Sequence, residues 1–439
     1  RRRHRPAETE DLAREAQTGA AAAPTAPKAP PHTPETPTPP PPGPHPPRRG
    51  GPPPPRPPRL PRNGPMTTTP RVALDALLDR SRTVITSLQE PNGAYPASPS
   101  FSAYRGYCWF RDGSFIADGA SAAGEAASAS AFHDWCAMVV VRYADRIRDI
   151  VEAADAGTPL PDEEMLPARF TFDGGLGSDD WWDFQLDGYG TWLWAAATHC
   201  GRHGIDPTRW TDAAALTVDY LLSSWARPCY DWWEEHDEAV HASTLGCIAA
   251  GLRAAADAGL VTGERAERAR AGAAEVTARL TRDAVVDGHL VKWIGSDAVD
   301  GSLSALLAPL GVIDAHSALG AGTLRAVSEQ LEVEGGVYRF RADTFFGGGR
   351  WPLLSCFLGL AYAAAGERDE ALRLLEWAAS TATGEGMLPE QVDGHLLAPG
   401  YRQEWLERWG PVATPLLWSH AMVLRLAVEL GVDHGELAA

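Results

Sequence analysis

From Arg71 onward, apolar residues recur at spacings of three and four positions, and sustained strand-like alternation is scarce. This pattern is typical of helices with one apolar face. Proline and glycine residues divide it into roughly a dozen segments. The predicted helices are 71–89, 113–124, 126–153, 187–204, 207–226, 239–258, 263–281, 302–310, 315–331, 352–365, 367–382 and 413–431. The pattern therefore predicts an all-α protein.

Many of these segments are rich in alanine, as in 195–197 and 254–256. Small side chains allow helices to approach closely, which suits helices packed on both sides. Helical pairs alternate with longer loops that carry aromatic residues. We therefore predict an (α/α)6 barrel, with six inner and six outer helices and a site at one mouth. A solenoid of repeats is the alternative, although no repeat of 33–45 residues is present.

The first 65 residues differ sharply from the rest of the chain. They hold 22 of the 37 prolines and none of the 16 tryptophans. A segment so poor in aromatic and β-branched residues buries too little apolar surface to offset its chain entropy. We therefore predict a disordered segment at 1–65 and a folded domain at 66–439, with Met66 as a candidate translation start.

The charge of the chain narrows its possible partners. Residues 66–439 carry 28 basic and 52 acidic residues, a net charge of −24. Such a surface repels phosphate backbones, which argues against a nucleic-acid partner. The chain has no apolar run of about 18 residues, so we expect no membrane-spanning helix. Neither the alanines at 20–23 nor the residues after Met66 resemble a signal peptide. We expect a cytoplasmic protein.

The six cysteines lie far apart and form no pair with zinc-like spacing. In a cytoplasmic chain of this length, buried free thiols are expected in place of disulfides.

Tryptophans gather in the predicted loops and beside acidic residues. Flat indole rings stack on the C–H face of a sugar, while charged side chains bind its hydroxyl groups. This composition favours a carbohydrate ligand. The tryptophans concerned are Trp109, Trp181, Trp182, Trp232, Trp233, Trp293, Trp351, Trp405 and Trp409.

Two of the four clusters that could carry chemistry come directly before predicted helices. The first spans 107–113 and contains Arg111 and Asp112, a pair that offers donors and acceptors to neighbouring hydroxyls. The second spans 181–188 and contains Asp187. Each aspartate has a plain alternative as the N-cap of the helix that follows it.

The other two clusters contain glutamates. In the segment 230–236, Glu234 and Glu235 follow two tryptophans. Contact with indole rings desolvates a carboxyl group, which raises its pKa and keeps it protonated, as a general acid requires. In the segment 386–394, Pro389 and flanking glycines place Glu390 on a loop. Solvated surface positions are the alternative for both clusters. Together, Glu234 and Glu390 match the two carboxylates of glycoside hydrolysis.

The four clusters and their order resemble glycoside hydrolase family 15, the glucoamylase-like inverting exo-glucosidases, over roughly residues 90–430. The segments 107–112, 185–190, 233–235, 338–346 and 388–392 are similar to successive family motifs. The resemblance implies an (α/α)6 catalytic domain, Glu234 as general acid and Glu390 as general base. It implies substrate-binding roles for Tyr107, Trp109, Arg111, Asp112, Trp181, Trp233, Glu235 and Arg339.

The chain departs from the family pattern in two places. Arg105 and Gly106 separate Tyr104 from the Arg–Asp motif, so Tyr104 replaces the usual tyrosine only if the loop bulges. The block 399–409 after the base is unusual and is a candidate for reshaping the leaving-group subsite.

The resemblance implies a hydrolase that releases β-glucose from small α-glucosides without metal or cofactor. The chain looks most like short family members that act on isomaltose, so an α-1,6 linkage is expected. An α-1,4 glucoamylase, a trehalase, a glycoside phosphorylase and a sugar-binding pseudoenzyme are the alternatives. We expect no membrane or nucleic-acid partner and a monomer or weak homo-oligomer.

Overall fold

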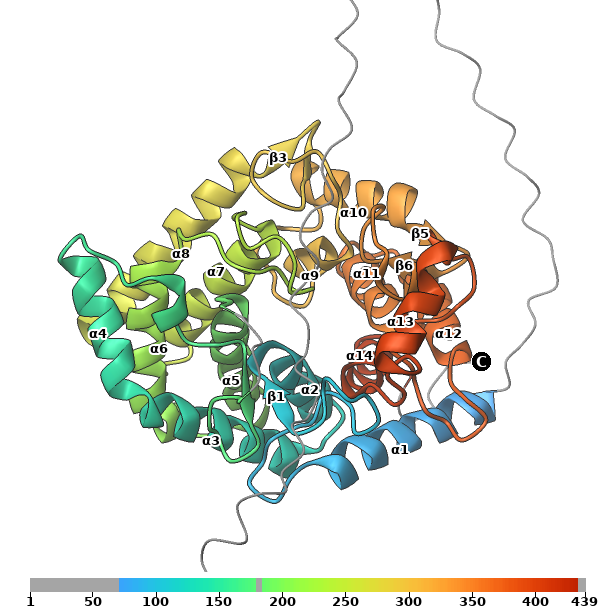
Figure 1. Cartoon of the computed structure of the whole chain (residues 1–439), viewed down its shortest axis with the longest axis horizontal. Helices are drawn as coiled ribbons and strands as arrows, with labels where there is room; N and C mark the ends of the chain where they lie inside the picture. The colour runs from blue at the N-terminus through green and yellow to red at the C-terminus, as the bar shows by residue number, and fades with distance from the viewer. Residues whose placement is uncertain (1–70, 179–183, 433–439) are drawn as a thin grey trace, which may run out of the picture. The chain divides into compact units, whose positions relative to one another are not determined.

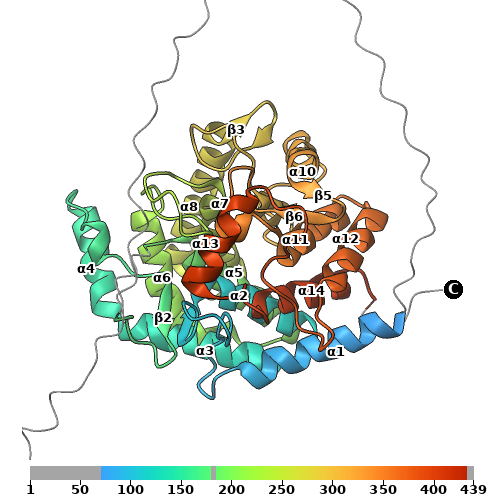
Figure 2. The same cartoon turned by 45° about the vertical axis from the view of Figure 1, so that its right-hand side comes forward.

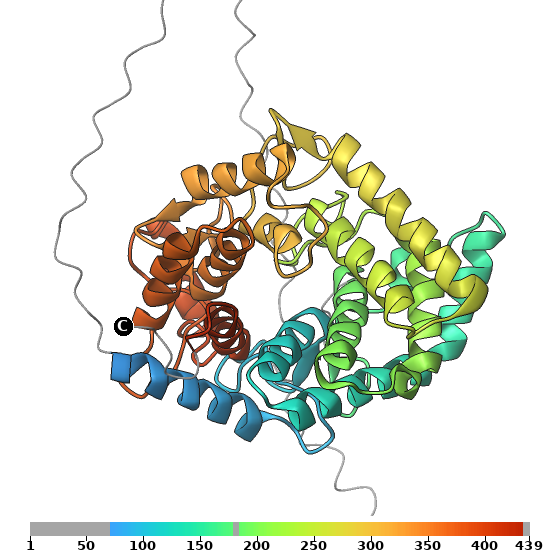
Figure 3. The same cartoon turned by 180° about the vertical axis from the view of Figure 1, so that it is seen from behind.

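The computed structural model describes residues 71–178 and 184–432. The predicted segment 1–65 lies outside this range. Within the unit formed by residues 66–177 and 182–439, inner helices contact one another in a closed cycle and outer helices pack around them. Figure 1 looks onto this ring, and Figure 3 shows it from behind. The predicted (α/α)6 barrel is confirmed.

The helices of the ring form an inner and an outer set. The inner helices are α2 (Phe110–Ala122), α5 (Asp187–His203), α7 (Ala242–Asp257), α9 (Ser304–Leu307), α11 (Pro352–Ala364) and α14 (Leu417–Glu429). The outer helices are α1 (Arg71–Leu88), α3 (Ala126–Arg142), α6 (Thr211–Ser224), α8 (Gly263–Asp283), α10 (Ala318–Leu331) and α12 (Arg368–Ser380). The other two helices of the described residues are α4 (Ala144–Asp155) and α13 (Arg402–Trp409). The antiparallel strand pairs are β1 (Tyr107–Trp109) with β2 (Arg169–Thr171), β3 (Val285–Val286) with β4 (His289–Leu290), and β6 (Gly336–Tyr338) with both β5 (Glu332–Val333) and β7 (Arg350–Trp351).

Small residues bring the inner helices together. Gly190 of α5 faces Gly251 of α7, where an added Cβ would lie 2.2 Å from the Gly190 carbonyl oxygen. Gly119 of α2 faces α14 in the same way, because its Cβ would lie 2.4 Å from the Ala421 oxygen. Since no side chain fits between these backbones, the interaxial distance is short. The close approach predicted from the alanine-rich composition is confirmed.

Several predicted boundaries are wrong for identifiable reasons. The predicted helix 126–153 is divided at Tyr143, whose hydroxyl donates to Gly174 O at 3.2 Å and whose ring packs on Phe170. The predicted helix 302–310 ends at Leu307, before Pro309, and the predicted helix 413–431 begins after Pro415. Proline lacks the N–H group and disfavours helical geometry in the preceding residue.

Three further observations on the described residues concern cysteines, membrane-spanning helices and metal sites. All six cysteines are buried free thiols, as predicted. None of the helices described is long and apolar enough to cross a membrane. No group of three or more histidine, cysteine, aspartate or glutamate side chains in the described ranges is placed to hold a metal ion.

Candidate active site

The sequence-predicted polar residues stand where inner helices begin. Arg111 and Asp112 lie in the first turn of α2, and Asp187 is the first residue of α5. Glu234 lies in the segment before α7, and Glu390 lies in the segment before α14. Because each side chain precedes or opens an inner helix, the ring brings them to one mouth.

Arg111 is the centre of a buried polar cluster. Its Nη1 donates to Gln185 Oε1 at 2.6 Å and to Asp187 Oδ2 at 3.0 Å, and its Nε lies 3.3 Å from Asp112 Oδ1. The capping alternatives for Asp112 and Asp187 are wrong. The helices begin with Trp109 and Leu186 at the cap positions, and neither aspartate side chain makes a capping hydrogen bond. The two carboxylates instead hold the Arg111 guanidinium.

The charge balance around Asp112 favours its protonated form more than usual. Burial raises its pKa to about 6, Arg111 lowers it, and the charge of Glu234 raises it further. The Asp112 and Glu234 carboxyl groups therefore interact electrostatically. Since buried charged carboxyls repel one another, a bound hydroxyl group would relieve part of this cost.

Glu234 sits in a tight turn with a left-handed backbone. Its φ is +62°, and its N–H donates to Asp231 O at 3.0 Å. The Asp231 carboxylate closes the turn, because its Oδ1 accepts from the backbone N–H groups of Trp233 at 2.9 Å and Glu235 at 3.0 Å. Trp109 Nε1 donates to Glu234 Oε1 at 2.5 Å. We call residues Asp231–Glu235 the acid turn.

The residues that flank Glu234 contact Arg339. Its guanidinium lies 5.3 Å from the ring centroid of Trp233, and its Nη2 donates to Glu235 Oε1 at 3.2 Å. Asp343 accepts from Arg339 Nε at 2.9 Å. Partial burial raises the pKa of Glu235, and Arg339 lowers it. The Glu235 side chain keeps 38% of its surface exposed, so it can still reach a ligand.

Glu390 is almost fully buried, with 2% of its surface exposed. Tyr104 donates its hydroxyl to Glu390 Oε1 at 2.7 Å. Burial raises the pKa of Glu390 to about 8, while the Tyr104 hydrogen bond and Arg339 lower it. The bulge that Tyr104 requires is present, because Gly106 turns the chain at a φ of +89°. Among the described residues, Glu390 Oε2 has no hydrogen-bond partner.

The segment that carries Glu390 is anchored to α14. His420 Nε2 accepts from Leu388 N at 3.0 Å, and Ser419 Oγ donates to Pro389 O at 2.8 Å. Because Nε2 accepts, Nδ1 carries the proton and faces Ser81 Oγ at 2.8 Å. Burial lowers the pKa of His420 to about 3, which keeps this imidazole neutral.

One aromatic pair connects the two glutamates. The rings of Tyr104 and Trp109 meet edge to face, with centroids 5.4 Å apart. Tyr104 binds Glu390 through its hydroxyl, and Trp109 binds Glu234 through its indole nitrogen. Burial raises the pKa of Tyr104 well above its usual value, and the charges of Glu390 and Glu234 raise it further. The aromatic pair therefore joins both carboxyl groups through one chain of contacts.

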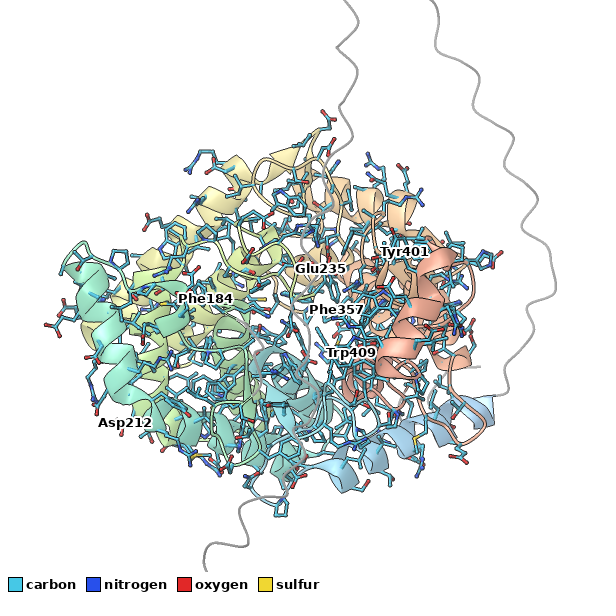
Figure 4. The ribbon with its side chains drawn as sticks, viewed as in Figure 1. Phe184, Asp212, Glu235, Phe357, Tyr401 and Trp409 are labelled. Carbon is cyan, nitrogen blue, oxygen red and sulfur yellow. The ribbon has the colours of Figure 1, made fainter. Side chains whose placement is uncertain are left out.

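Two predicted residues remain. Tyr107 lies on β1, where its ring meets Trp109 edge to face at a centroid distance of 6.3 Å and the Arg169 guanidinium covers it at 3.9 Å from the centroid. Trp181 lies outside the described residues. The block 399–409 contains α13, which packs Trp405 against Phe345 at a centroid distance of 4.9 Å. Figures 1 and 2 show α13 on the face of the ring toward the viewer, and Figure 4 shows Trp409 and Glu235 nearer the ring's centre than Asp212.

Some polar residues of the site were not singled out from the sequence. Gln185 and Asp343 make direct contacts to Arg111 and Arg339. Each lies in the same sequence motif as a predicted residue, so its position in the motif could have identified it. Lys292 and Asp300 lie far from the motifs in sequence, and only the fold brings them beneath the acid turn.

A helical ring with one buried and one partly buried glutamate near tryptophans at its mouth has the arrangement of a glycoside hydrolase. The chain matches the model of glycosyl hydrolases family 15 over residues 71–428. An isomaltose glucohydrolase from Kribbella flavida is 54% identical over 363 residues, which cover 82% of this chain and 94% of the relative. The chain belongs to glycosyl hydrolases family 15 and is a glycoside hydrolase.

Solved structures agree with this membership. A wild-type glycosidase has a TM-score of 0.81 and 52% identity, covering 84% of this chain and 99% of that one. A variant of the glycosidase with one glutamate replaced by alanine, solved in complex with glucose, aligns equally well. A bacterial glucoamylase complexed with acarbose has a TM-score of 0.65 at 20% identity, covering 82% of this chain and 56% of that one. The last similarity concerns the fold alone.

Proposed function

We propose that this enzyme releases β-glucose from the non-reducing end of small α-glucosides, with Glu234 as general acid and Glu390 as general base. The observation that carries the proposal is the Tyr104–Trp109 pair, which links the two carboxyl groups in one pocket. Two carboxyls at a sugar-binding mouth meet the requirement of glycoside hydrolysis.

The proposed reaction is a single displacement. Trp109 donates to Oε1 of Glu234, so the other oxygen holds the proton that passes to the glycosidic oxygen as the C1–O bond breaks. Glu390 takes a proton from a water whose oxygen bonds to C1 on the opposite face. Its Oε2 is the free acceptor, because Tyr104 binds Oε1. Inversion requires about 6.5–9.5 Å between the carboxyl groups, enough for this water.

The raised pKa of Glu390 suits a general base. A carboxylate that is harder to ionise accepts a proton more strongly once ionised, and catalysis is best when the pKa is near the working pH. Asp112, Arg111 and Arg339 provide acceptors and donors for sugar hydroxyls. Trp233 is half-buried beside Arg339 and offers an indole face.

The proposed substrate is an α-1,6-linked glucoside such as isomaltose. The support is the relative named isomaltose glucohydrolase, to which the chain is 54% identical. Trp405, which belongs to the block 399–409, packs against Phe345 and Phe346. We infer that these rings line the leaving-group side and limit access for a long glucan chain.

Proton NMR at early times tests the proposed function. The full-length protein is incubated separately with isomaltose, maltose and trehalose, and the anomeric signal of fresh glucose is recorded. We expect β-glucose first, and isomaltose consumed fastest. Intact isomaltose in the presence of folded enzyme that cleaves maltose or trehalose would refute the linkage proposal. Fresh α-glucose would refute inversion, and with it the assigned acid–base pair.

Replacing Tyr104 by phenylalanine tests the environment of Glu390. The hydroxyl donates to the ionised carboxylate and lowers its pKa, so its removal raises the pKa of Glu390 above about 8. Less of the base is then ionised at a given pH. A hydrogen bond to a charged group contributes about 1.5–3 kcal/mol, which corresponds to roughly one to two pH units. We expect the rising limb of kcat/KM against pH to move upward by this amount, and an unchanged limb would contradict the proposal.

A further inference from the structure

The chain contains 39 basic residues, yet only two of them are lysines. Lys28 lies outside the described residues, and Lys292 lies two residues after the end of β4. The Lys292 side chain is buried, with 3% of its surface exposed. Arginine carries a wide planar fork, whereas lysine presents a compact point charge. In a chain that uses arginine almost everywhere else, this position holds the compact cation.

Two buried carboxylates surround the ammonium group. Lys292 Nζ lies 2.7 Å from Asp231 Oδ2 and 2.5 Å from Asp300 Oδ2, and each aspartate side chain is 2% exposed. The ring centroid of Phe340 lies 4.1 Å from the same nitrogen. The lysine backbone is held as well, because Lys292 N donates to Ala298 O at 2.7 Å. The cation therefore has a fixed place between the two acids.

Both carboxylates accept hydrogen bonds from Trp233, the residue before Glu234. Asp231 accepts from the backbone N–H of Trp233, and Asp300 accepts from its indole Nε1 at 3.0 Å. Asp300 is itself held by Ser302, whose N–H and hydroxyl donate to Oδ1 at 2.9 and 2.6 Å. The Lys292 ammonium group thus connects Asp231, which binds the backbone of the acid turn, to Asp300, which binds the Trp233 side chain.

The turn needs such an anchor. A non-glycine residue at positive φ has a conformational cost of about 1–3 kcal/mol and persists only where its surroundings impose it. The Asp231 carboxylate holds the backbone on both sides of Glu234, because it accepts from the N–H groups of Trp233 and Glu235. Without a cation, two buried carboxylates at this spacing repel each other, and one of them would take up a proton or move.

We propose that Lys292 is a positioning residue for the general acid: it ties Asp231 to Asp300 and so holds Glu234 at the glycosidic oxygen. This inference rests on the proposed role of Glu234. Lys292 itself touches neither substrate nor the reacting atoms. Its loss should impair proton donation while leaving the base, anchored on α14, in place.

Two substrates with different leaving groups separate a loss of proton donation from a general loss of activity. Isomaltose releases a sugar alkoxide that must be protonated, whereas α-glucosyl fluoride releases fluoride without needing the acid. We expect Lys292→Met to lower kcat on isomaltose by about 10²-fold, within the usual range for a general acid. Any change in KM should be the same for both substrates, because the acid turn also carries Trp233 and Glu235, and kcat on α-glucosyl fluoride should stay near wild type.

Arg425→Met is the matched control. Arg425 forms a buried ion pair with Asp118 at 3.1 Å, on α14 and α2 and away from the acid turn. We expect this variant to lose thermal stability without any change in the ratio of the two rates. If Lys292→Met lowers both rates equally, as a merely structural role requires, the inference is overturned.

Two further variants keep the result decisive. Glu234→Gln should show the same dependence on the leaving group, more strongly. If it does and Lys292→Met does not, only the role of Lys292 fails; if neither does, the role of Glu234 fails. If Lys292→Met does not fold, the double variant Lys292→Met with Asp300→Asn is used. It removes one charge of each sign, so Asp231 no longer faces a second buried carboxylate. Wild-type activity of that folded double variant on isomaltose would equally refute the inference.

Discussion

Glu234→Gln is expected to lower kcat on isomaltose by about 10²- to 10⁴-fold, the range that a general acid contributes. The amide keeps the size of the side chain, and its oxygen can still accept from Trp109 Nε1. It holds no acidic proton, so the departing sugar leaves unprotonated. The loss is measured by steady-state kinetics, with a thermal melt to show that the fold is retained.

Glu235→Gln provides the control for this prediction, because it alters the adjacent residue of the same turn. Glu235 binds Arg339 at 3.2 Å and keeps exposed surface, so its proposed role is in substrate binding. We expect this variant to raise KM more than it lowers kcat. Wild-type turnover by Glu234→Gln, or a larger kcat loss in Glu235→Gln, would refute the assignment of the acid.

Glu390→Ala is the second substitution with a large expected effect, again about 10²- to 10⁴-fold on kcat. Without the carboxylate, no group takes the proton from the attacking water. Azide needs no deprotonation, and the shorter side chain leaves space for it. We expect sodium azide to restore the consumption of α-glucosyl fluoride by this variant and to yield β-glucosyl azide, identified by proton NMR.

The configuration of that product tests the face of attack, and the anomer first released by the wild-type enzyme distinguishes a base from a nucleophile at Glu390. Attack on the face opposite fluoride gives the β-azide, as a single displacement requires. The α-azide would indicate a double displacement and would contradict the role of Glu390. Glu234→Gln serves as the control, because its base is intact and azide should bring no gain. Failure of azide to form any glycosyl azide with folded Glu390→Ala would also count against the assignment.

Local sequence patterns were sufficient for the ring and for most of the polar residues at its mouth. Inner helices carry small and apolar residues, and the motif residues lie in the segments that precede these helices or in their first turns. Glu234, Glu390, Arg111 and Asp112 were therefore found without the fold. The left-handed backbone of Glu234 was not predictable, because it depends on a carboxylate that accepts from its neighbours.

Contacts between distant segments explain most of what sequence reasoning missed. Lys292 and Asp300 approach the acid turn from 61 and 69 positions beyond Asp231, with no local motif to mark them. The raised pKa of Glu390 depends on burial that the assembled ring creates. The helix α13 was missed because its eight residues are mostly polar and charged, too short for a periodic pattern to stand out.

The hydrogen bonds of His420 have a consequence for how activity arises during protein synthesis. His420 lies on α14, and it joins Ser81 on α1 to Leu388 beside the base. A ribosome makes α1 and the acid turn long before it makes α14, and early segments can begin to fold first. A nascent chain that ends before α14 contains Glu234 but leaves the segment of Glu390 without its anchor. Under the proposed mechanism, catalysis therefore begins only when the last inner helix is translated and docks against the first outer one.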